Sequence, residues 1–148
     1  MMNKIIWLTG QPGSGKTTIA KELLKYFETK KIKSINVDGD DLRELMENKD
    51  YSKSGRFKNI KLAQRIALFC QNKKFQVIVS LVAPYLELRE EFKNKTDVFE
   101  IYLYTSEKRG REHFFSKDYE KPIDNYISID TTNKTVKECV DEILTIYR

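Results

Sequence analysis

The segment that most constrains the fold of this chain is residues 10–17, which read Gly-Gln-Pro-Gly-Ser-Gly-Lys-Thr. They match the pattern G-x-x-x-x-G-K-[ST], and they stand between an apolar run at 5–8 and an amphipathic stretch at 17–27. The glycines let the backbone turn tightly and point several N–H groups at phosphate oxygens, and a following helix adds its positive end. Residues 10–17 therefore predict a triphosphate-binding loop, called the phosphate loop below. The alternative is a glycine-rich turn without a ligand.

Individual residues of the phosphate loop have separate expected roles. Lys16 is expected to contact the β- and γ-phosphates of ATP and to act as a catalytic residue, because its charge stabilises the transferring phosphoryl group. The hydroxyl of Thr17 is expected to bind Mg²⁺. The full set of expected ATP-binding residues is Gly10, Gly13, Ser14, Gly15, Lys16, Thr17 and Thr18.

Along the rest of the chain, short apolar runs alternate with amphipathic stretches. The expected strands are 5–8, 35–37, 77–79, 99–103 and 126–129. The expected helices are 17–27, a segment through Glu47 capped by Asp40 or Asp41, about 57–71, a segment after Pro84, and 136–147, with 51–55 as a polar turn. This alternation is typical of parallel βαβ units. We therefore predict an α/β fold, a three-layer P-loop NTPase of the nucleoside or nucleotide kinase type with a mostly parallel five-stranded sheet.

A chain of 148 residues is the size of one compact domain, so residues 1–148 are expected to form a single P-loop kinase domain. The stretch 109–125 departs from the periodic pattern, because it is rich in charged and aromatic residues. A long loop in a compact domain is usually functional, so residues 109–125 are predicted to form a mobile lid, and this name is kept below.

The composition indicates which cellular locations and which kinds of partner to expect for the protein. The 27 basic and 22 acidic residues give a formal net charge of +5, but the lysines are scattered, so no nucleic-acid partner is predicted. The apolar runs are too short for a membrane-spanning helix, and the first residues lack the pattern of a signal peptide. Cys70 and Cys139 are too far apart for a zinc pair, and a disulfide is not expected. These features predict a cytoplasmic location without membrane contact.

Other classes of P-loop protein fit the sequence poorly. A GTPase needs a D-x-x-G switch, which the chain lacks, and the N-K-x-D match at 94–97 follows a charged helical stretch rather than a buried strand. An ATPase motor usually needs a longer chain for its partner surfaces. A small-molecule kinase needs a phosphate loop, an acceptor-side carboxylate and a lid that excludes water.

Two carboxylates, Asp38 and Asp40, directly follow the expected strand 35–37. Ligands of open α/β sheets bind outside the carboxyl ends of the strands, so both side chains are expected beside the phosphate loop. One carboxylate is suited to accept the proton of an acceptor hydroxyl or to orient that hydroxyl, and the other to hold Mg²⁺ through water. The alternative is a solvated acidic turn that caps a helix.

Further motifs occur in a fixed order: Ile6-Trp7-Leu8-Thr9-Gly10, the GQPGSGKTT loop, Val37-Asp38-Gly39-Asp40-Asp41-Leu42-Arg43, Arg56-x-x-Asn59-Ile60, Ala83-Pro84-Tyr85 and Tyr119-Glu120-x-Pro122. In this order and near this spacing, they resemble the adenylyl-sulfate kinase family over nearly the whole chain. The resemblance implies ATP-dependent phosphorylation of the 3′-hydroxyl of adenosine 5′-phosphosulfate, a step of sulfate activation. It also implies ATP and Mg²⁺ as cofactors and a small-molecule nucleotide as acceptor. Members of the family often dimerise, so a homodimer is an expected assembly.

The resemblance assigns roles to residues on the acceptor side. Asp40 looks like the acidic residue beside the acceptor hydroxyl and is the expected base. This leaves Asp38, on the positional argument given above, as the carboxylate expected to join Thr17 at the metal. The expected acceptor-binding residues are Asp40, Arg43, Tyr51, Arg56, Asn59, Val82 and Ala83. Tyr51 would stack on the acceptor base, a contact worth about 1–3 kcal/mol. The alternatives are helix-surface charges for the two arginines and a half-buried loop anchor for Tyr51.

The sequence departs from the family pattern on the acceptor side. Ala83 replaces a common serine, and Leu86 replaces an arginine, although Arg89 matches a later arginine. The lid is shorter than that of the family by about a dozen residues. Side chains that could replace the missing lid contacts are Phe114 or Phe115 and Arg109, Arg111 or Lys117.

The shortened lid keeps other functions open. A cytidine diphosphoramidate kinase of capsule modification is the leading alternative, because such enzymes resemble adenylyl-sulfate kinases. A non-catalytic nucleotide-binding module and a polynucleotide kinase are further alternatives. His113, the only histidine, lies in the polar lid and is expected to be solvated rather than catalytic.

Overall fold

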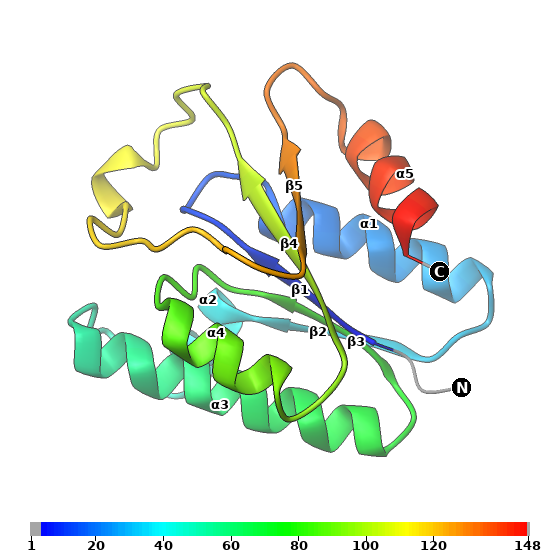
Figure 1. The fold of residues 1–148 in the computed structure, drawn as a ribbon, viewed down its shortest axis with the longest axis horizontal. Helices are drawn as coiled ribbons and strands as arrows, with labels where there is room; N and C mark the ends of the chain where they lie inside the picture. The colour runs from blue at the N-terminus through cyan, green and yellow to red at the C-terminus, as the bar shows by residue number, and fades with distance from the viewer. Residues whose placement is uncertain (1–3, 148) are drawn as a thin grey trace.

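The computed structural model describes residues 4–147 and contains one fully parallel sheet of five strands (Figure 1). The strands are β1 (Ile5–Thr9), β2 (Ser34–Asp38), β3 (Gln76–Ser80), β4 (Val98–Tyr104) and β5 (Tyr126–Asp130). Their order in the sheet is β2-β3-β1-β4-β5, so all five predicted strands are confirmed. At the carboxyl edge, Asp38 of β2 lies in register with Ser80 of β3.

The helices cover both faces of the sheet and complete the predicted three-layer α/β fold. They are α1 (Lys16–Thr29), α2 (Gly39–Leu45), α3 (Lys53–Asn72), α4 (Leu86–Lys93) and α5 (Val136–Ile146). Figure 1 shows α1 and α5 on one face and α3 and α4 on the other.

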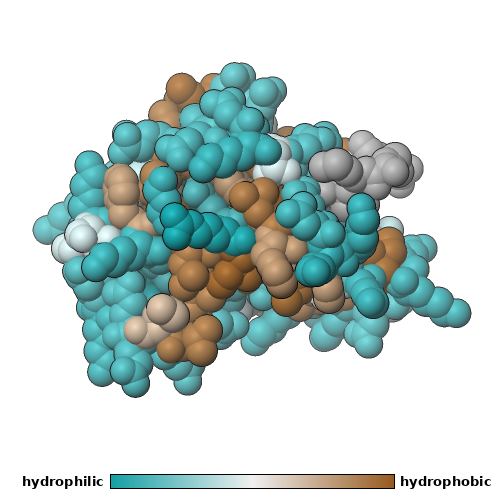
Figure 2. Space-filling model, turned by 90° about the horizontal axis from the view of Figure 1, so that it is seen from below, coloured by the Kyte–Doolittle hydropathy of each residue, from teal (hydrophilic) through white to brown (hydrophobic). Residues whose placement is uncertain are grey.

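The central strand β1 is buried on both faces, because successive side chains of a strand point to opposite sides. Ile5 and Trp7 pack into the core under α3 and α4, whereas Ile6 and Leu8 pack into the core under α1 and α5. The outer surface on the α3 side is mostly hydrophilic, with a few hydrophobic residues gathered near its centre (Figure 2). Two separate cores thus fix the sheet whose carboxyl edge carries the site.

Two helix starts differ from the sequence prediction. The side chain of Asp38, not of Asp40 or Asp41, caps α2 by accepting hydrogen bonds from the N–H groups of Asp40 and Asp41, and this helix ends at Leu45 rather than Glu47. The predicted turn at 51–55 is wrong beyond its first residues, because Ser52 caps α3 and the helix begins at Lys53.

Three other expectations from the sequence concern features outside the carboxyl edge. Cys70 and Cys139 are both free thiols, and each lies buried in a different core. The N-K-x-D match lies at the amino ends of the strands, where Asp97 O accepts a hydrogen bond from Ile5 N, so it is far from the phosphate loop. Among residues 4–147, no helix is both long and apolar enough to cross a membrane.

The lid is irregular apart from one turn of 3-10 helix at Glu112–Phe114. It crosses from the end of β4 to the start of β5, as the yellow to orange segment of Figure 1 shows. The irregular backbone agrees with the absence of hydrophobic periodicity in its sequence.

Candidate active site

The phosphate loop closes tightly against the sheet at the carboxyl end of β1. A Cβ atom at Gly10 would collide with the backbone carbonyl oxygen of Leu103 in β4, so glycine is required for this approach. Helix α1 then begins after Gly15 without a side-chain cap, unlike α2, α3 and α5. The first N–H groups of α1 therefore remain available for phosphate oxygens.

The side chain of Lys16 is buried at the centre of this loop. Its Nζ donates hydrogen bonds to Gln11 O at 2.9 Å and to Ser14 Oγ at 3.4 Å. Burial lowers the pKa of Lys16 to about 8, against the opposing effect of the Asp40 and Asp38 carboxylates. Below this pKa the ammonium group carries a partly desolvated charge, which phosphate oxygens in the loop would stabilise.

The lowered pKa predicts how ATP capture depends on pH. Below about pH 8 Lys16 is charged, and above it the free enzyme loses this charge. We expect kcat/KM for ATP to fall about tenfold per pH unit above pH 8, whereas kcat holds to higher pH because bound phosphates raise the pKa of Lys16 again. Initial rates from pH 6.5 to 9.5 test this. A Lys16→Arg variant should show no such fall, because guanidinium stays charged; a flat wild-type profile would contradict the expectation.

Asp38 joins the phosphate loop to the ends of two strands. Its Oδ1 accepts hydrogen bonds from Thr17 Oγ1 at 2.9 Å and from Ser80 Oγ at 2.6 Å, while its Oδ2 caps α2. The carboxylate is buried and fully engaged, which fixes the Thr17 hydroxyl beside it. Ser80 was missed by the sequence reasoning, since only the register of β2 and β3 reveals it.

The oxygens of Thr17 and Asp38 fit a magnesium ion that also binds ATP phosphates. Mg²⁺ prefers oxygen ligands and usually keeps several waters beside one or two carboxylates and substrate phosphates. Within residues 4–147, no cluster of three or more His, Cys, Asp or Glu side chains could hold a metal alone. This donor set therefore suits an ion that arrives with its nucleotide rather than a resident metal.

Asp40 follows Asp38 by two residues and lies in the first turn of α2. Its side chain is exposed and lines the same cleft as Lys16 and Thr17, and it contributes to the electrostatic field at Lys16. The two carboxylates thus differ: Asp38 is buried and hydrogen-bonded, whereas Asp40 is exposed and lines the cleft.

Two arginines surround Tyr51 on the far side of the cleft. The Arg43 guanidinium lies 4.0 Å from the centre of the Tyr51 ring, and Arg43 Nη1 donates hydrogen bonds to Asn48 O and Asp50 O. Arg56 Nε donates to Tyr51 O at 3.0 Å. The ring is 56% exposed. The arginines hold Tyr51 in place, so its remaining surface can serve as a platform.

Asn59 is a buried residue of α3. Its Nδ2 donates to Gly39 O at 3.3 Å, whereas its Oδ1 is buried without a hydrogen-bond partner among the described residues. Asn59 lines the cleft. A buried polar atom without a partner usually indicates a ligand or water, so Asn59 offers an acceptor to a donor in the cleft.

The segment 81–84, called the acceptor loop below, forms one wall of the cleft. Val82 O accepts a hydrogen bond from Thr9 Oγ1 at 2.8 Å, and Ala83 O accepts one from Arg89 Nη1. Ala83 has φ +42°, a left-handed conformation that is strained for a residue with a side chain. Because both carbonyls are engaged, backbone contacts to an acceptor are best made by the N–H groups.

Arg89 is a buried structural residue rather than a ligand-facing one. It pairs with Glu100 of β4 at 3.0 Å and also donates a hydrogen bond to Glu120 O at the end of the lid. With Ala83, these contacts join the sheet, the acceptor loop and the lid.

One cleft of about 400 Å³ gathers most of the predicted site residues. It is lined by the predicted Gly13, Gly15, Lys16, Thr17, Thr18, Asp38, Asp40, Arg43, Tyr51, Arg56, Asn59, Val82 and Ala83. Gly10 and Ser14 shape the loop without lining the cleft. Lining residues not predicted as site residues include Pro12, Gly39, Ile60, Ser80, Leu81 and Pro84.

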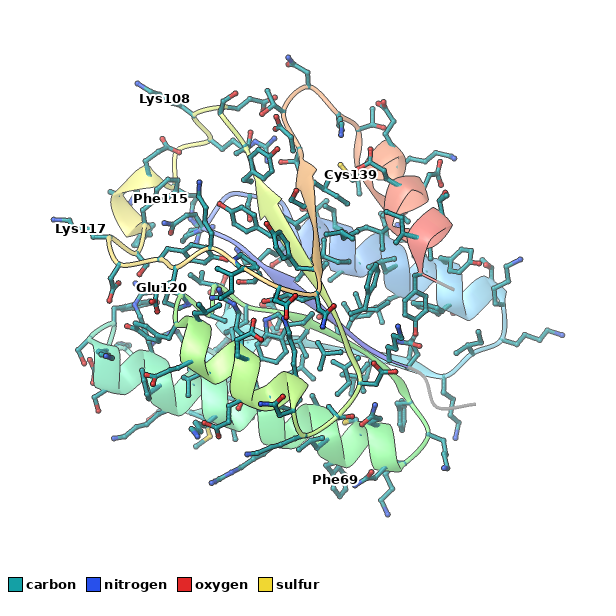
Figure 3. All side chains as sticks on the ribbon, viewed as in Figure 1. Phe69, Lys108, Phe115, Lys117, Glu120 and Cys139 are labelled. Carbon is teal, nitrogen blue, oxygen red and sulfur yellow. The ribbon has the colours of Figure 1, made fainter. Side chains whose placement is uncertain are left out.

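The structure shows which of the alternative lid side chains named from the sequence line the cleft and which do not. Arg111 and Phe114 line the cleft, together with Arg109. Arg109 is engaged by Glu107, Gly13 O and Thr131, whereas the Arg111 guanidinium lies over the Phe114 ring. Phe115 and Lys117 are exposed and absent from the cleft lining, and Lys117 points into solvent (Figure 3). The exposed His113 is also absent from the lining.

The model of the adenylylsulphate kinase family matches residues 2–138. The chain belongs to this family. Together with the site, membership shows that the protein is an ATP-dependent kinase with a hydroxyl acceptor, and it confirms the resemblance found in the sequence.

Relatives of this adenylylsulphate kinase family member act on more than one nucleotide. The cytidine diphosphoramidate kinase of Campylobacter jejuni is 32% identical over 131 residues, covering 85% of this chain and 77% of that protein. The adenylyl-sulfate kinase of Prochlorococcus marinus is 30% identical over 162 residues, covering 95% and 81%. The APS kinase CysC of Mycobacterium tuberculosis, solved with AMPPNP and APS, has a TM-score of 0.84 at 21% identity, covering 97% and 96%. The fold is thus that of a P-loop kinase.

Proposed function

We propose that this protein transfers the γ-phosphoryl group of ATP to the 3′-hydroxyl of a nucleotide conjugate, with adenylyl sulfate as the first candidate acceptor. The observation that supports this most is the single cleft, in which the phosphate loop faces Asp40, Arg43, Tyr51 and Arg56. A phosphoryl donor and a nucleotide acceptor can therefore bind side by side in one cleft.

The residues have complementary parts in the proposed reaction. The amide groups of the phosphate loop and Lys16 hold the triphosphate and stabilise the charge that develops on the transferring group. Thr17 would bind Mg²⁺ directly and Asp38 through water, and the ion neutralises charge on the phosphates. Asp40 orients the acceptor hydroxyl and accepts its proton as the new phosphate ester forms.

The acceptor side suits an anionic nucleotide. Arg43 and Arg56 supply positive charge beside Tyr51, whose ring is available for a base, and Asn59 Oδ1 can accept a hydrogen bond from a ribose hydroxyl. Phe114 of the lid is the aromatic side chain that can cover the acceptor from above.

A cytidine diphosphoramidate kinase is the second candidate. The similarity to the C. jejuni enzyme favours it, as do the shortened lid and Ala83 in place of the serine of the family pattern. A panel that measures kcat/KM for adenylyl sulfate and cytidine diphosphoramidate, with mass spectrometry of the 3′-phosphorylated products, tests the two. A higher kcat/KM for adenylyl sulfate supports the first candidate, and a higher value for the cytidine conjugate replaces it with the second. If neither is phosphorylated, the proposal fails.

The stacking role of Tyr51 makes a separate prediction. Tyr51→Ala should raise KM for the acceptor about tenfold and leave KM for ATP nearly unchanged, because a base–ring stack is worth about 1–3 kcal/mol. Tyr51→Phe keeps the ring and is the matched control. Steady-state kinetics with each substrate varied separately checks this, and an equal rise in both KM values would exclude the stacking role.

The resemblance to the family predicts that the protein forms a homodimer. Light scattering on the purified protein, with and without nucleotide, measures its mass directly.

A further inference from the structure

The side chain of Gln11 connects the phosphate loop to the lid through two hydrogen bonds. Gln11 Nε2 donates to Ser116 O at 2.8 Å, and Ser116 N donates back to Gln11 Oε1 at 2.9 Å. Ser116 is one of the few buried residues of the lid. Because the pair is reciprocal, one amide side chain fixes both the position and the direction of the lid backbone at this point.

Gln11 also contacts the catalytic lysine through its backbone. Gln11 O accepts hydrogen bonds from Lys16 Nζ at 2.9 Å and from Ser14 N at 3.2 Å. The same residue therefore bonds the lid with its side chain and the resting Lys16 with its carbonyl group. The phosphate-loop motif places no requirement on the side chain at this position, so the use of glutamine is explained by the lid.

A second attachment fixes the other end of the lid. Arg109 Nη1 donates to Gly13 O at 3.0 Å, and Arg109 Nη2 donates to Thr131 O. Thr131 Oγ1 in turn donates to Ser14 O. Residues 110–115, called the lid tip below, thus span the phosphate loop between two attachments.

The lid tip carries two side chains that line the cleft. Arg111 and Phe114 line the cleft, and the Arg111 guanidinium lies 5.4 Å from the centre of the Phe114 ring. The positive charge of Arg111 is close enough to oppose protonation of Lys16, so it already lies near the phosphate site. A lid released at Ser116 would remove both side chains from these positions.

We propose that Gln11 is a positioning residue, whose side-chain amide holds the lid tip over the phosphate loop so that Arg111 faces the phosphates and water is kept out. This inference rests on the proposed kinase function and adds to it a residue outside the acceptor and metal sets. Exclusion of water matters because an ATP-bound kinase can otherwise lose its phosphoryl group by hydrolysis.

The test compares Gln11→Leu with Ser116→Ala. The first variant removes both hydrogen bonds but keeps a side chain of similar size. The second keeps the backbone pair and removes only the Ser116 hydroxyl, which bonds Asp118 within the lid. Two quantities are measured on the full chain: the rate of trypsin cleavage within residues 108–117, and the ratio of phosphoryl transfer to ATP hydrolysis without acceptor.

For Gln11→Leu we expect cleavage about tenfold faster than in wild type and a transfer-to-hydrolysis ratio about tenfold lower, as the loss of two hydrogen bonds allows. Ser116→Ala should stay within about twofold of wild type in both. The proposal is overturned if Gln11→Leu is cleaved at the wild-type rate. It is also overturned if cleavage is faster but the transfer-to-hydrolysis ratio is unchanged. Cleavage needs no acceptor, so a failure of this attachment is distinguishable from a wrong choice of acceptor.

Discussion

Replacing Lys16 with alanine should lower kcat/KM by at least about 10³-fold, which corresponds to about 4 kcal/mol of transition-state stabilisation. Lys16 Nζ lies inside the phosphate loop, where its side chain is buried and hydrogen-bonded to the loop backbone. A positive charge in such a place stabilises the developing charge of the transferring phosphoryl group far more than it would in water. Coupled-assay kinetics with ATP and the best acceptor measure the loss.

Folding should survive this substitution, so the loss can be assigned to chemistry. Burial disfavours the charged form of Lys16, and alanine removes that desolvated charge from the first turn of α1 without lowering helix propensity. Lys25→Ala is the matched control, because Lys25 is an exposed residue of the same helix and forms a surface ion pair with Glu22. Lys16→Ala turnover within tenfold of wild type would refute the role of Lys16.

Asp40→Asn should lower kcat by about 10²- to 10⁴-fold, the usual contribution of a positioned general base. The amide keeps the size of the carboxylate but cannot accept the proton of the acceptor hydroxyl. The KM for ATP should change little, because the phosphate loop and Asp38 stay intact. Measuring kcat and both KM values separately distinguishes this loss from weaker binding.

Asp41→Asn provides the control for Asp40→Asn. Asp41 is exposed in the same first turn of α2, and its N–H also bonds Asp38, but its side chain does not line the cleft. We expect wild-type kinetics from this variant. Equal losses in both variants would mean that charge at the start of α2, rather than proton transfer at Asp40, supports turnover.

The sequence predicted the strands well because their signal is local. Each strand is a short β-branched or apolar run, and burial on both faces leaves little room for polar residues. The start of α3 was not predicted, because the local sequence there is misleading. Gly55 was interpreted as a turn residue, but it lies inside the helix, at a position where a Cβ atom would collide with the Asp50 carbonyl oxygen.

The parts of the site that are formed by residues adjacent in sequence could be predicted. The parts that are formed where distant segments meet could not. The phosphate loop and the Asp38-Gly39-Asp40 turn are each contiguous in sequence, so their residues could be named from the sequence, and most of them line the cleft. The choice of Asp38 as the helix cap depends on its contacts with Thr17 and Ser80. The Gln11 contact with Ser116 spans 105 residues and has no signature in either segment.

The engagement of Arg89 has a consequence for changing the acceptor of this enzyme. The Arg89 guanidinium donates hydrogen bonds both to Ala83 O and to the buried side chain of Glu100 in β4. The cleft wall formed by residues 81–84 is therefore held by contacts with the core of the sheet. Mutations that reshape this wall would disturb a buried charge pair and lower the yield of folded protein. Laboratory evolution toward new nucleotides should therefore find its beneficial substitutions mainly between residues 110 and 115, where the backbone can vary at small thermodynamic cost.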